Sequence, residues 1–124
     1  MRKLLILGLC SILFSTDIAY SQTIPYTINE VTIVPNYIGG QIKLNEFVAA
    51  NFVSPENEGV TGTIKIKFII ETNGTLTNIK IVQSLGDDYT QAAKNVFLKS
   101  PKWLPGEFNG EKVRVIMNYP IIIQ

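Results

Sequence analysis

Few side chains in this 124-residue sequence are suited to catalysis or metal binding. Histidine is absent, and the only cysteine, Cys10, lies in an apolar N-terminal run. Two acidic pairs are candidates for general acid–base chemistry, Asp87 with Asp88 and Glu56 with Glu58. The first pair stands at a predicted helix start, where carboxylates favour the helix dipole, and the second lies in a predicted loop. We therefore expect no enzymatic activity, no cofactor and no metal site.

The first 21 residues have the pattern of a secretory signal peptide. A basic start is followed by apolar residues 4–14 and by the small-residue site Ala19-Tyr20-Ser21. This apolar run is well short of the ~20 residues that span a bilayer, which favours cleavage after Ser21. An uncleaved anchor over residues 4–20 remains the alternative. Lipidation of Cys10 is disfavoured because such processing sites usually need a small residue at the position of Leu9.

Cleavage at this site defines a mature chain of one small domain. It removes 21 of 124 residues, including two basic and one acidic side chain, and leaves nine side chains of each charge. This length suits a single hydrophobic core, and the loss of Cys10 rules out a disulfide. A near-neutral charge argues against nucleic-acid or anionic-membrane partners, which usually meet an excess of basic charge. The features together predict a periplasmic or secreted protein.

The mature chain begins with a leader and a short helix. Residues 22–36 mix Thr, Ile, Val and Pro in an extended segment that could be an edge strand or an arm. Residues 43–52 are predicted to form a helix that ends before Ser54-Pro55. Its apolar side chains recur at helical spacing and belong to Leu44, Phe47, Val48 and Phe52.

A β-hairpin follows the short helix. Apolar and polar residues alternate from Thr63 to Glu71, which predicts a strand with one buried face. Asn73-Gly74 suits a two-residue type I′ turn, and residues 76–83 return as the partner strand.

A second helix is predicted over residues 88–99. Asp88 and Gln91 have the spacing of a capping box. One apolar stripe consists of Tyr89, Ala92, Ala93, Val96 and Phe97. A turn-rich connector over residues 100–110 carries the only tryptophan, Trp103, which we expect to pack in the core rather than contact a partner.

A last strand over residues 112–123 completes the predicted fold. A strand–helix–strand unit favours parallel strands, so the first strand of the hairpin can lie between the other two and antiparallel to both. The fold class is then α+β, with a three-stranded antiparallel or mixed sheet and helices on one face. The last strand lies at an edge, blunted at its tail by Pro120, and residues 112–119 are open to pairing with an extended peptide.

Several short motifs in order along the chain resemble the TonB C-terminal domain family, in the form common in Bacteroidetes. The resemblance covers residues 37–123 and is strongest in the connector between helix and last strand. The matching motifs are Tyr37-Ile38-Gly39-Gly40, Asn51-Phe52, Gly59-Val60-Thr61-Gly62, Asn73-Gly74, the run Pro101-Lys102-Trp103-Leu104-Pro105-Gly106-Glu107-Phe108-Asn109-Gly110, and Tyr119-Pro120-Ile121. Ile38 stands where the family usually has proline, and the family's membrane anchor and Pro-rich linker are not visible.

The resemblance implies a domain over residues 37–124 with a peptide-docking edge. The docking residues are expected to be Lys112, Val113, Arg114, Val115, Ile116, Met117, Asn118 and Tyr119. Structural roles are expected for Gly39, Gly40, Gly62, Asn73, Gly74, Pro101, Trp103, Pro105, Gly106, Asn109 and Gly110.

Three functional hypotheses follow. The first is a periplasmic module, linked to transmembrane transport, that docks a segment of an outer-membrane transporter or another envelope protein. The second is a short energy transducer anchored by residues 4–20. The third is a structural envelope protein that self-associates, for example as a homodimer, through the same edge.

Overall fold

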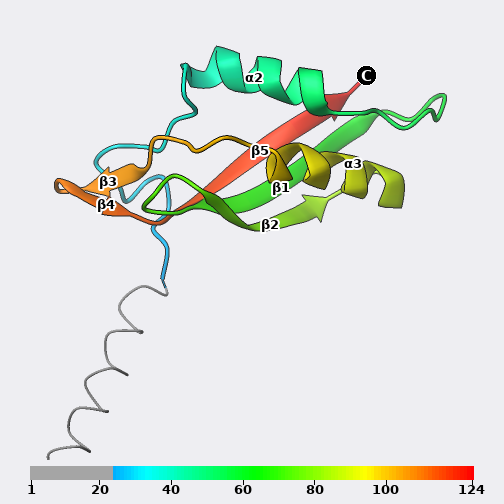
Figure 1. The fold of residues 1–124 in the computed structure, drawn as a ribbon. Helices are drawn as coiled ribbons and strands as arrows, with labels where there is room; N and C mark the ends of the chain where they lie inside the picture. Colours follow the sequence, from blue (N-terminus) through cyan, green and yellow to red (C-terminus); the bar gives the residue numbers. More distant parts are fainter. Residues whose placement is uncertain (1–23) are drawn as a thin grey trace, which may run out of the picture.

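The computed structural model describes residues 24–124, in which two helices and five strands follow one another along the chain (Figure 1). The predicted signal peptide over residues 1–21, its alternative as an anchor and Cys10 lie outside the described residues. The elements are α2 (Gly40–Asn51), β1 (Gly62–Ile70), β2 (Leu76–Gln83), α3 (Asp87–Leu98), β3 (Gly106–Phe108), β4 (Glu111–Val113) and β5 (Val115–Ile123).

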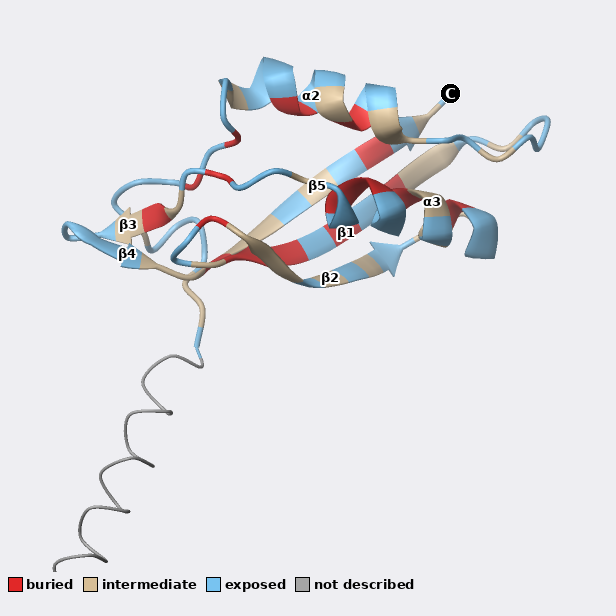
Figure 2. Cartoon of the chain, viewed as in Figure 1, coloured by how far each residue is buried: buried red, intermediate tan, exposed pale blue. Residues whose placement is uncertain are grey.

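The main sheet has the order β2-β1-β5, with β1 antiparallel to both neighbours. This order confirms the predicted central position of the first strand and the α+β fold class. β1 and β5 pair in one continuous register, from Gly62 opposite Ile123 to Ile70 opposite Val115. Both helices contribute buried side chains to one core on the same face of the sheet (Figure 2).

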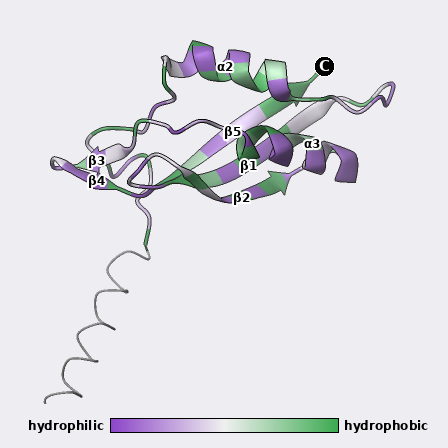
Figure 3. Cartoon of the chain, in the orientation of Figure 1, coloured by the Kyte–Doolittle hydropathy of each residue, from purple (hydrophilic) through white to green (hydrophobic). Residues whose placement is uncertain are grey.

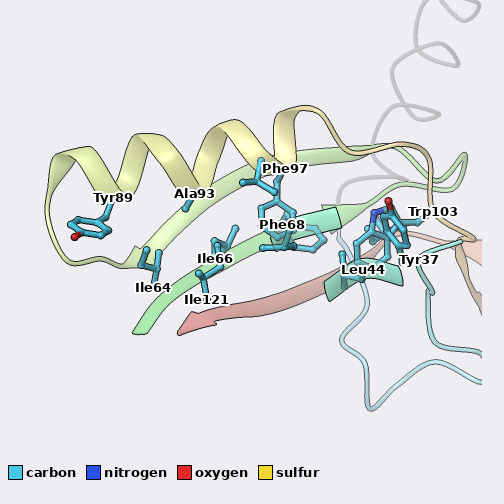
Figure 4. Packing of buried hydrophobic residues seen from close by; sticks show 13 residues of the cluster. Tyr37, Leu44, Ile64, Ile66, Phe68, Tyr89, Ala93, Phe97, Trp103 and Ile121 are labelled. Carbon is cyan, nitrogen blue, oxygen red and sulfur yellow. The ribbon is translucent and has the colours of Figure 1, made fainter. Parts of the chain in front are cut away.

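Alternation along β1 makes this core. Ile64, Ile66, Phe68 and Ile70 are at most 1% exposed, and they face the helices because every second residue of a strand points to the same side. They pack against the buried stripe of α3, which includes Tyr89, Ala93 and Phe97, while Leu44 of α2 lies near Trp103 (Figure 4). Burial of each large apolar side chain stabilises the fold by roughly 2 kcal/mol.

The start of α3 differs from the predicted capping box. The N-cap position is Gly86, without a side-chain cap, and the helix begins at Asp87. The backbone N–H of Thr90 donates to the carbonyl of Gly86, and the Thr90 hydroxyl donates to Ser84 Oγ at 2.7 Å. Asp88 therefore contributes through its charge near the positive helix end rather than through a capping hydrogen bond.

The turn between β1 and β2 is a three-residue loop, so the predicted type I′ turn is wrong. The N–H of Gly74 donates to Glu71 O, and the N–H of Glu71 donates to Thr75 O, both at 2.8 Å. Asn73 has a negative φ, as a type I turn requires, and its side chain accepts hydrogen bonds from the N–H and hydroxyl of Thr75. Only Gly74 has a positive φ, of 87°, as expected for a type I turn with a following bulge.

Gly74 also holds the connector against the tip of this hairpin. The N–H of Trp103 donates to Gly74 O at 2.8 Å. A Cβ atom at position 74 would lie 2.1 Å from the carbonyl oxygen of Trp103, so no larger residue fits. Close backbone approach and positive φ therefore both require glycine at this position.

Trp103 is 4% exposed and lies in the core, as predicted. Its ring makes edge contacts with Tyr37 and Phe68, each with ring centroids 5.6 Å apart. Its Nε1–H donates to Ser100 Oγ at 2.9 Å, so the single polar atom of the indole has a partner.

The C-terminal part of the predicted connector forms a second hairpin, which the sequence analysis missed. β3 and β4 pair from Gly106 opposite Val113 to Phe108 opposite Glu111. Asn109 and Gly110 have φ values of 49° and 86°, so both adopt the left-handed conformation of a type I′ turn. These strands are only three residues long, too short for a recognisable alternation.

The single strand predicted over residues 112–123 is accordingly divided. Lys112 and Val113 belong to β4, Arg114 lies between the strands, and β5 begins at Val115. β5 then continues through Pro120 to Ile123, so proline does not end the strand.

The leader runs beside three segments of the C-terminal half. Isolated bridges join Tyr26 to Val115, Ile33 to Glu107 and Asn36 to Leu104. Residues 33–36 thereby flank β3 on the side away from β4, because the N–H and C=O of Ile33 both bond to Glu107. The leader is thus an arm fixed to the domain.

Candidate peptide-docking edge

The backbone of β5 directs alternate residues away from β1. At its start, Arg114 O accepts the N–H of Tyr26 at 2.7 Å, and Ile116 N–H donates to Tyr26 O at 2.9 Å. Residue 116 therefore points outward, and so do residues 118, 120 and 122, since backbone orientation alternates along a strand. Residues 115, 117, 119, 121 and 123 direct their backbone groups toward β1.

Outward groups from residues 118 to 122 have no backbone partner within residues 24–124. Asn118 and Ile122 each offer one N–H and one C=O, and Pro120 offers a C=O. Because Pro120 lies opposite Lys65 with its nitrogen outward, its missing N–H costs the ladder with β1 nothing. The open part of the edge suits an extended peptide of about five residues, at roughly 3.3 Å per residue.

The leader limits this open part at one end. Tyr26 bonds to the outward C=O of Arg114 and to the outward N–H of Ile116, and its ring lies 5.3 Å from that of Phe108. The chain then turns away, because Thr27 and Glu30 form a tight turn in which Glu30 Oε1 accepts the N–H of Thr27 at 2.8 Å. Within residues 24–124, the outward backbone groups of β5 that lack a backbone partner therefore begin at the C=O of Ile116.

A groove of about 450 Å³ runs between β5 and α2, beside this open edge. Its walls are formed by Asn45, Val48, Ala49 and Phe52 of the helix side and by Tyr119, Pro120, Ile121, Ile122 and Ile123 of the strand. Most of these side chains are apolar. A strand added to β5 would present every second side chain to this groove.

Tyr119 joins the two walls of the groove. Its hydroxyl donates to Asn45 Oδ1 at 2.7 Å, and its ring lies 5.6 Å from that of Phe97. Burial raises the pKa of Tyr119 above its ordinary value, because the phenolate would be poorly solvated there. The side chain therefore stays neutral and fixes α2 over β5.

An ion pair lies at the other end of β5. Arg114 Nε donates to Glu71 Oε1 at 2.7 Å and Arg114 Nη2 to Glu71 Oε2 at 3.1 Å. This bidentate bond lowers the pKa of Glu71, against the opposing effect of burial, and the Thr77 hydroxyl adds a further hydrogen bond to the carboxylate. The same bond raises the pKa of Arg114. The pair fastens the end of β1 to the start of β5.

The eight predicted docking residues therefore fall into different environments. Lys112 and Val113 belong to the second hairpin, and Val115 is fully buried. Ile116, Met117, Asn118 and Tyr119 do lie on β5, with Asn118 exposed and directed outward. Arg114, expected to face a partner, instead holds Glu71.

The residues expected to be structural lie mostly in connections. Gly39 is the N-cap of α2 and Gly40 its first residue. Gly62 begins β1 close to Leu85, and Gly106 begins β3 close to Val115 and Pro35. Pro101 and Pro105 lie on either side of Trp103, and Asn73, Gly74, Asn109 and Gly110 form the two hairpin turns.

Sequence reasoning missed the distal part of the edge and the helix wall of the groove. Pro120 was predicted to blunt the tail of the edge, so Ile122 was not included among the expected docking residues. The signal that could have revealed it is the run of isoleucines after Pro120, which restores β-branched residues typical of a strand.

The acidic pairs considered for catalysis are exposed in the structure, and neither lines the groove between β5 and α2. Within residues 24–124, no group of three or more His, Cys, Asp or Glu side chains is placed to hold a metal ion. In the same part of the chain, neither helix is long and apolar enough to cross a membrane.

The helices on one face of a three-stranded sheet, with β5 as an outer strand, define an α+β domain. Comparison with family models then gives one match, described as the C-terminal domain of the Gram-negative bacterial TonB protein, over residues 56–122. The match takes in more than half of the 124 residues, and the chain belongs to this family. Neither the curated proteins nor the solved structures contain a match to the chain.

Family membership gives the general role. Domains of this family are envelope modules related to transport, and they interact with outer-membrane transporters. The chain is accordingly a TonB-like envelope module.

Proposed function

We propose that this protein is a periplasmic, non-enzymatic module that docks an extended segment of an outer-membrane TonB-dependent transporter, or of another envelope protein, on the outer edge of β5. The open backbone groups from Asn118 to Ile122 are the observation that carries the proposal. Family membership supports the choice of partner, since related domains interact with such transporters.

The docked segment would extend the sheet to the order β2-β1-β5-peptide. Backbone hydrogen bonds to Asn118, Pro120 and Ile122 would supply affinity largely independent of sequence. Side chains on one face of the peptide would enter the groove beneath α2, whose apolar walls favour apolar residues. The Tyr119–Asn45 hydrogen bond would keep that groove in shape.

Proline substitutions at outward positions test the proposal directly. Asn118→Pro and Ile122→Pro each remove one outward N–H and leave the ladder with β1 intact. We expect either change to weaken capture of ten-residue peptides, taken from periplasmic N-terminal segments of the same cell's transporters, by roughly tenfold or more.

Alanine at the same positions provides the control, because Asn118→Ala and Ile122→Ala keep both N–H groups. Peptide affinity measured by calorimetry should then stay within about threefold of the unmodified protein, since side chains contribute less than the backbone. Folded proline variants that bind as well as the alanine variants would contradict docking at this edge.

Self-association is a second use of the same open edge. Two copies could pair their β5 strands through the Asn118 and Ile122 groups. Sedimentation at increasing concentration distinguishes the two uses: a monomer at all concentrations contradicts the homodimer, and a dimer lost in Asn118→Pro supports it.

Location and the N-terminus remain part of the proposal. We place the mature protein in the periplasm after cleavage of residues 1–21, with residues 22–36 as its arm. The mass of the protein from fractionated cells tests this: a chain beginning at Gln22 in the soluble fraction is expected. An intact Met1 in the membrane fraction would favour an anchored short energy transducer.

A further inference from the structure

The face of the sheet opposite the helices carries a cluster of three lysines. Lys65 and Lys67 are two residues apart on β1, so they share a face, and Lys67 lies directly opposite Lys80 of β2. All three are exposed. Directly opposite residues have Cβ atoms about 5 Å apart, so the three charges gather within roughly 10 Å. We call these residues the lysine cluster.

Acidic side chains do not offset this cluster. The residues registered beside it on β5 and β2 are Asn118, Pro120 and Gln83, all uncharged. The ion pairs within residues 24–124 are Lys43 with Glu46 and Arg114 with Glu71, and neither includes the lysine cluster. Like charges directly across a ladder destabilise the pairing, so the fold itself gives no reason for Lys67 opposite Lys80.

The overall charge conceals this segregation. Residues 22–124 contain equal numbers of acidic and basic side chains, nine of each. The acidic ones lie in the leader, the helices, the loop before β1 and the second hairpin, apart from Glu71, which Arg114 holds. The near-neutral net charge of residues 22–124 argues against an anionic-membrane partner for the domain as a whole, but this face is locally basic.

Apolar side chains surround the cluster. Val82 is 56% exposed at the edge of β2, and Ile122 is 64% exposed on the same face of β5 as Pro120. A hollow of about 350 Å³ on this face is lined by Lys65, Val82 and Pro120, among others. Figure 3 shows the hydrophilic and hydrophobic segments that alternate along β1 and β2.

We propose that this open face of the sheet binds the surface of an anionic phospholipid bilayer. Each lysine near such a surface contributes electrostatic attraction to the headgroups, while Val82, Pro120 and Ile122 can enter the headgroup region. A protein partner fits less well, because protein interfaces are depleted in lysine and enriched in arginine and aromatic residues. The lysine cluster itself lies outside the groove of β5, whereas Pro120 and Ile122 border both sites.

Amine labelling on the full chain locates the bound face. The protein is mixed with vesicles of about 70% phosphatidylcholine and 30% phosphatidylglycerol, which represent a moderately anionic membrane. The exposed amines are then acetylated for a short time. Labelling of Lys65, Lys67 and Lys80, read by mass spectrometry, should slow at least about fivefold, as expected when a surface covers these amines. Lys94 and Lys102, on the helix and connector side, should label as in free protein.

Matched variants test whether charge is the cause. The triple substitution Lys65→Gln, Lys67→Gln and Lys80→Gln should weaken pelleting with these vesicles by roughly a hundredfold at low salt. The control Lys94→Gln, Lys99→Gln and Lys102→Gln has the same net charge and should bind as the unmodified protein. Circular dichroism checks that both variants fold.

Three results would overturn the proposal. The first is equal labelling of the lysine cluster with and without anionic vesicles. The second is equal protection by vesicles of phosphatidylcholine alone, which would make charge irrelevant. The third is protection by polyglutamate but not by vesicles, which would assign the face to an acidic protein segment.

Discussion

The two outer strands of the sheet present opposite kinds of edge. β5 pairs with β1 residue for residue over its whole length, and its outward groups stay in line. β2 pairs with the same strand through two irregularities, each of which inserts one extra residue into β2. One of them contains Asn78, which has a φ of 50°. Bulges of this kind twist a strand and spoil it as a template for another chain.

The fold thus interrupts the edge at β2 with bulges and leaves the edge at β5 regular. Two bulges interrupt β2, and α3 packs against it, whereas in the described part of the chain the outward backbone groups of β5 have a backbone partner only at its start, in Tyr26. An open edge is a hazard of aggregation unless it serves a purpose. Variants that exchange or remove these features test the contrast.

The largest effect is expected from Met117→Pro. The N–H of Met117 points toward β1 opposite Phe68, so proline removes a ladder hydrogen bond and clashes with the neighbouring strand. Urea denaturation should show a loss of about 3 kcal/mol or more in the free energy of unfolding. Asn118→Pro, one residue away but outward, should cost less than about 1 kcal/mol. Equal losses would refute the assigned orientation of β5.

A smaller effect is expected from substituting Asn78, which lies in one of the two bulges of β2. Asn78→Val places a β-branched residue in the left-handed region, at a cost of about 1–2 kcal/mol. Asn78→Gly should be neutral or slightly stabilising, because glycine adopts this conformation freely. Valine that is tolerated as well as glycine would mean that β2 can straighten, and the contrast between the edges would weaken.

The carboxylate of Glu71 accepts hydrogen bonds from Thr77 of β2 and from Arg114, which directly precedes β5. Glu71→Gln should therefore lower the free energy of unfolding by about 1 kcal/mol at pH 7. The pKa of Glu71 is lowered on folding, so its contribution is full above the ordinary value of 4.5 and is lost as pH falls below it. Unfolding measured from pH 7 to pH 3 should show the difference between variant and unmodified protein shrinking. Glu56→Gln, in an exposed loop, is the control and should leave the free energy of unfolding at pH 7 nearly unchanged.

The smallest effect is expected from loosening the arm. Tyr26→Ala removes the ring contact with Phe108 and should cost about 0.5–1 kcal/mol. Amide hydrogen exchange should then become faster at Ile116, while Asn118 stays as fast as before. Ile24→Ala, at a side chain 83% exposed, should leave both rates unchanged. An unchanged Ile116 rate in Tyr26→Ala would mean that the ring is not needed to hold the arm.

Local patterns predicted much of this architecture. The alternation in β1 and the apolar stripe of α3 fixed the layers, and the order of the elements placed β1 at the centre. The features that went unpredicted depend on distant partners or on single residues. Nothing near Tyr26 indicates that it bonds to residues 114 and 116, about ninety positions along the chain.

The outer position of the last strand was predicted correctly, but the extent of its open edge was not. The outer position of the last strand followed from topology, whereas its true start depended on the short β3–β4 hairpin. Asn109-Gly110 did mark a turn in the sequence, but the strands beside it were too brief to recognise. Pro120 was predicted to blunt the tail of this edge, and the side to which its nitrogen points depends on the register with β1, which the sequence does not show.

The burial of Trp103 has a spectroscopic consequence. It is the only tryptophan of the chain, and its indole lies in the core between Tyr37 and Phe68 rather than beside the groove of β5. Its fluorescence should be blue-shifted in the native state and move to longer wavelength when the core opens. Peptide binding at β5 should leave this emission nearly unchanged. The fluorescence of Trp103 should therefore report unfolding of the core but not occupancy of the edge of β5.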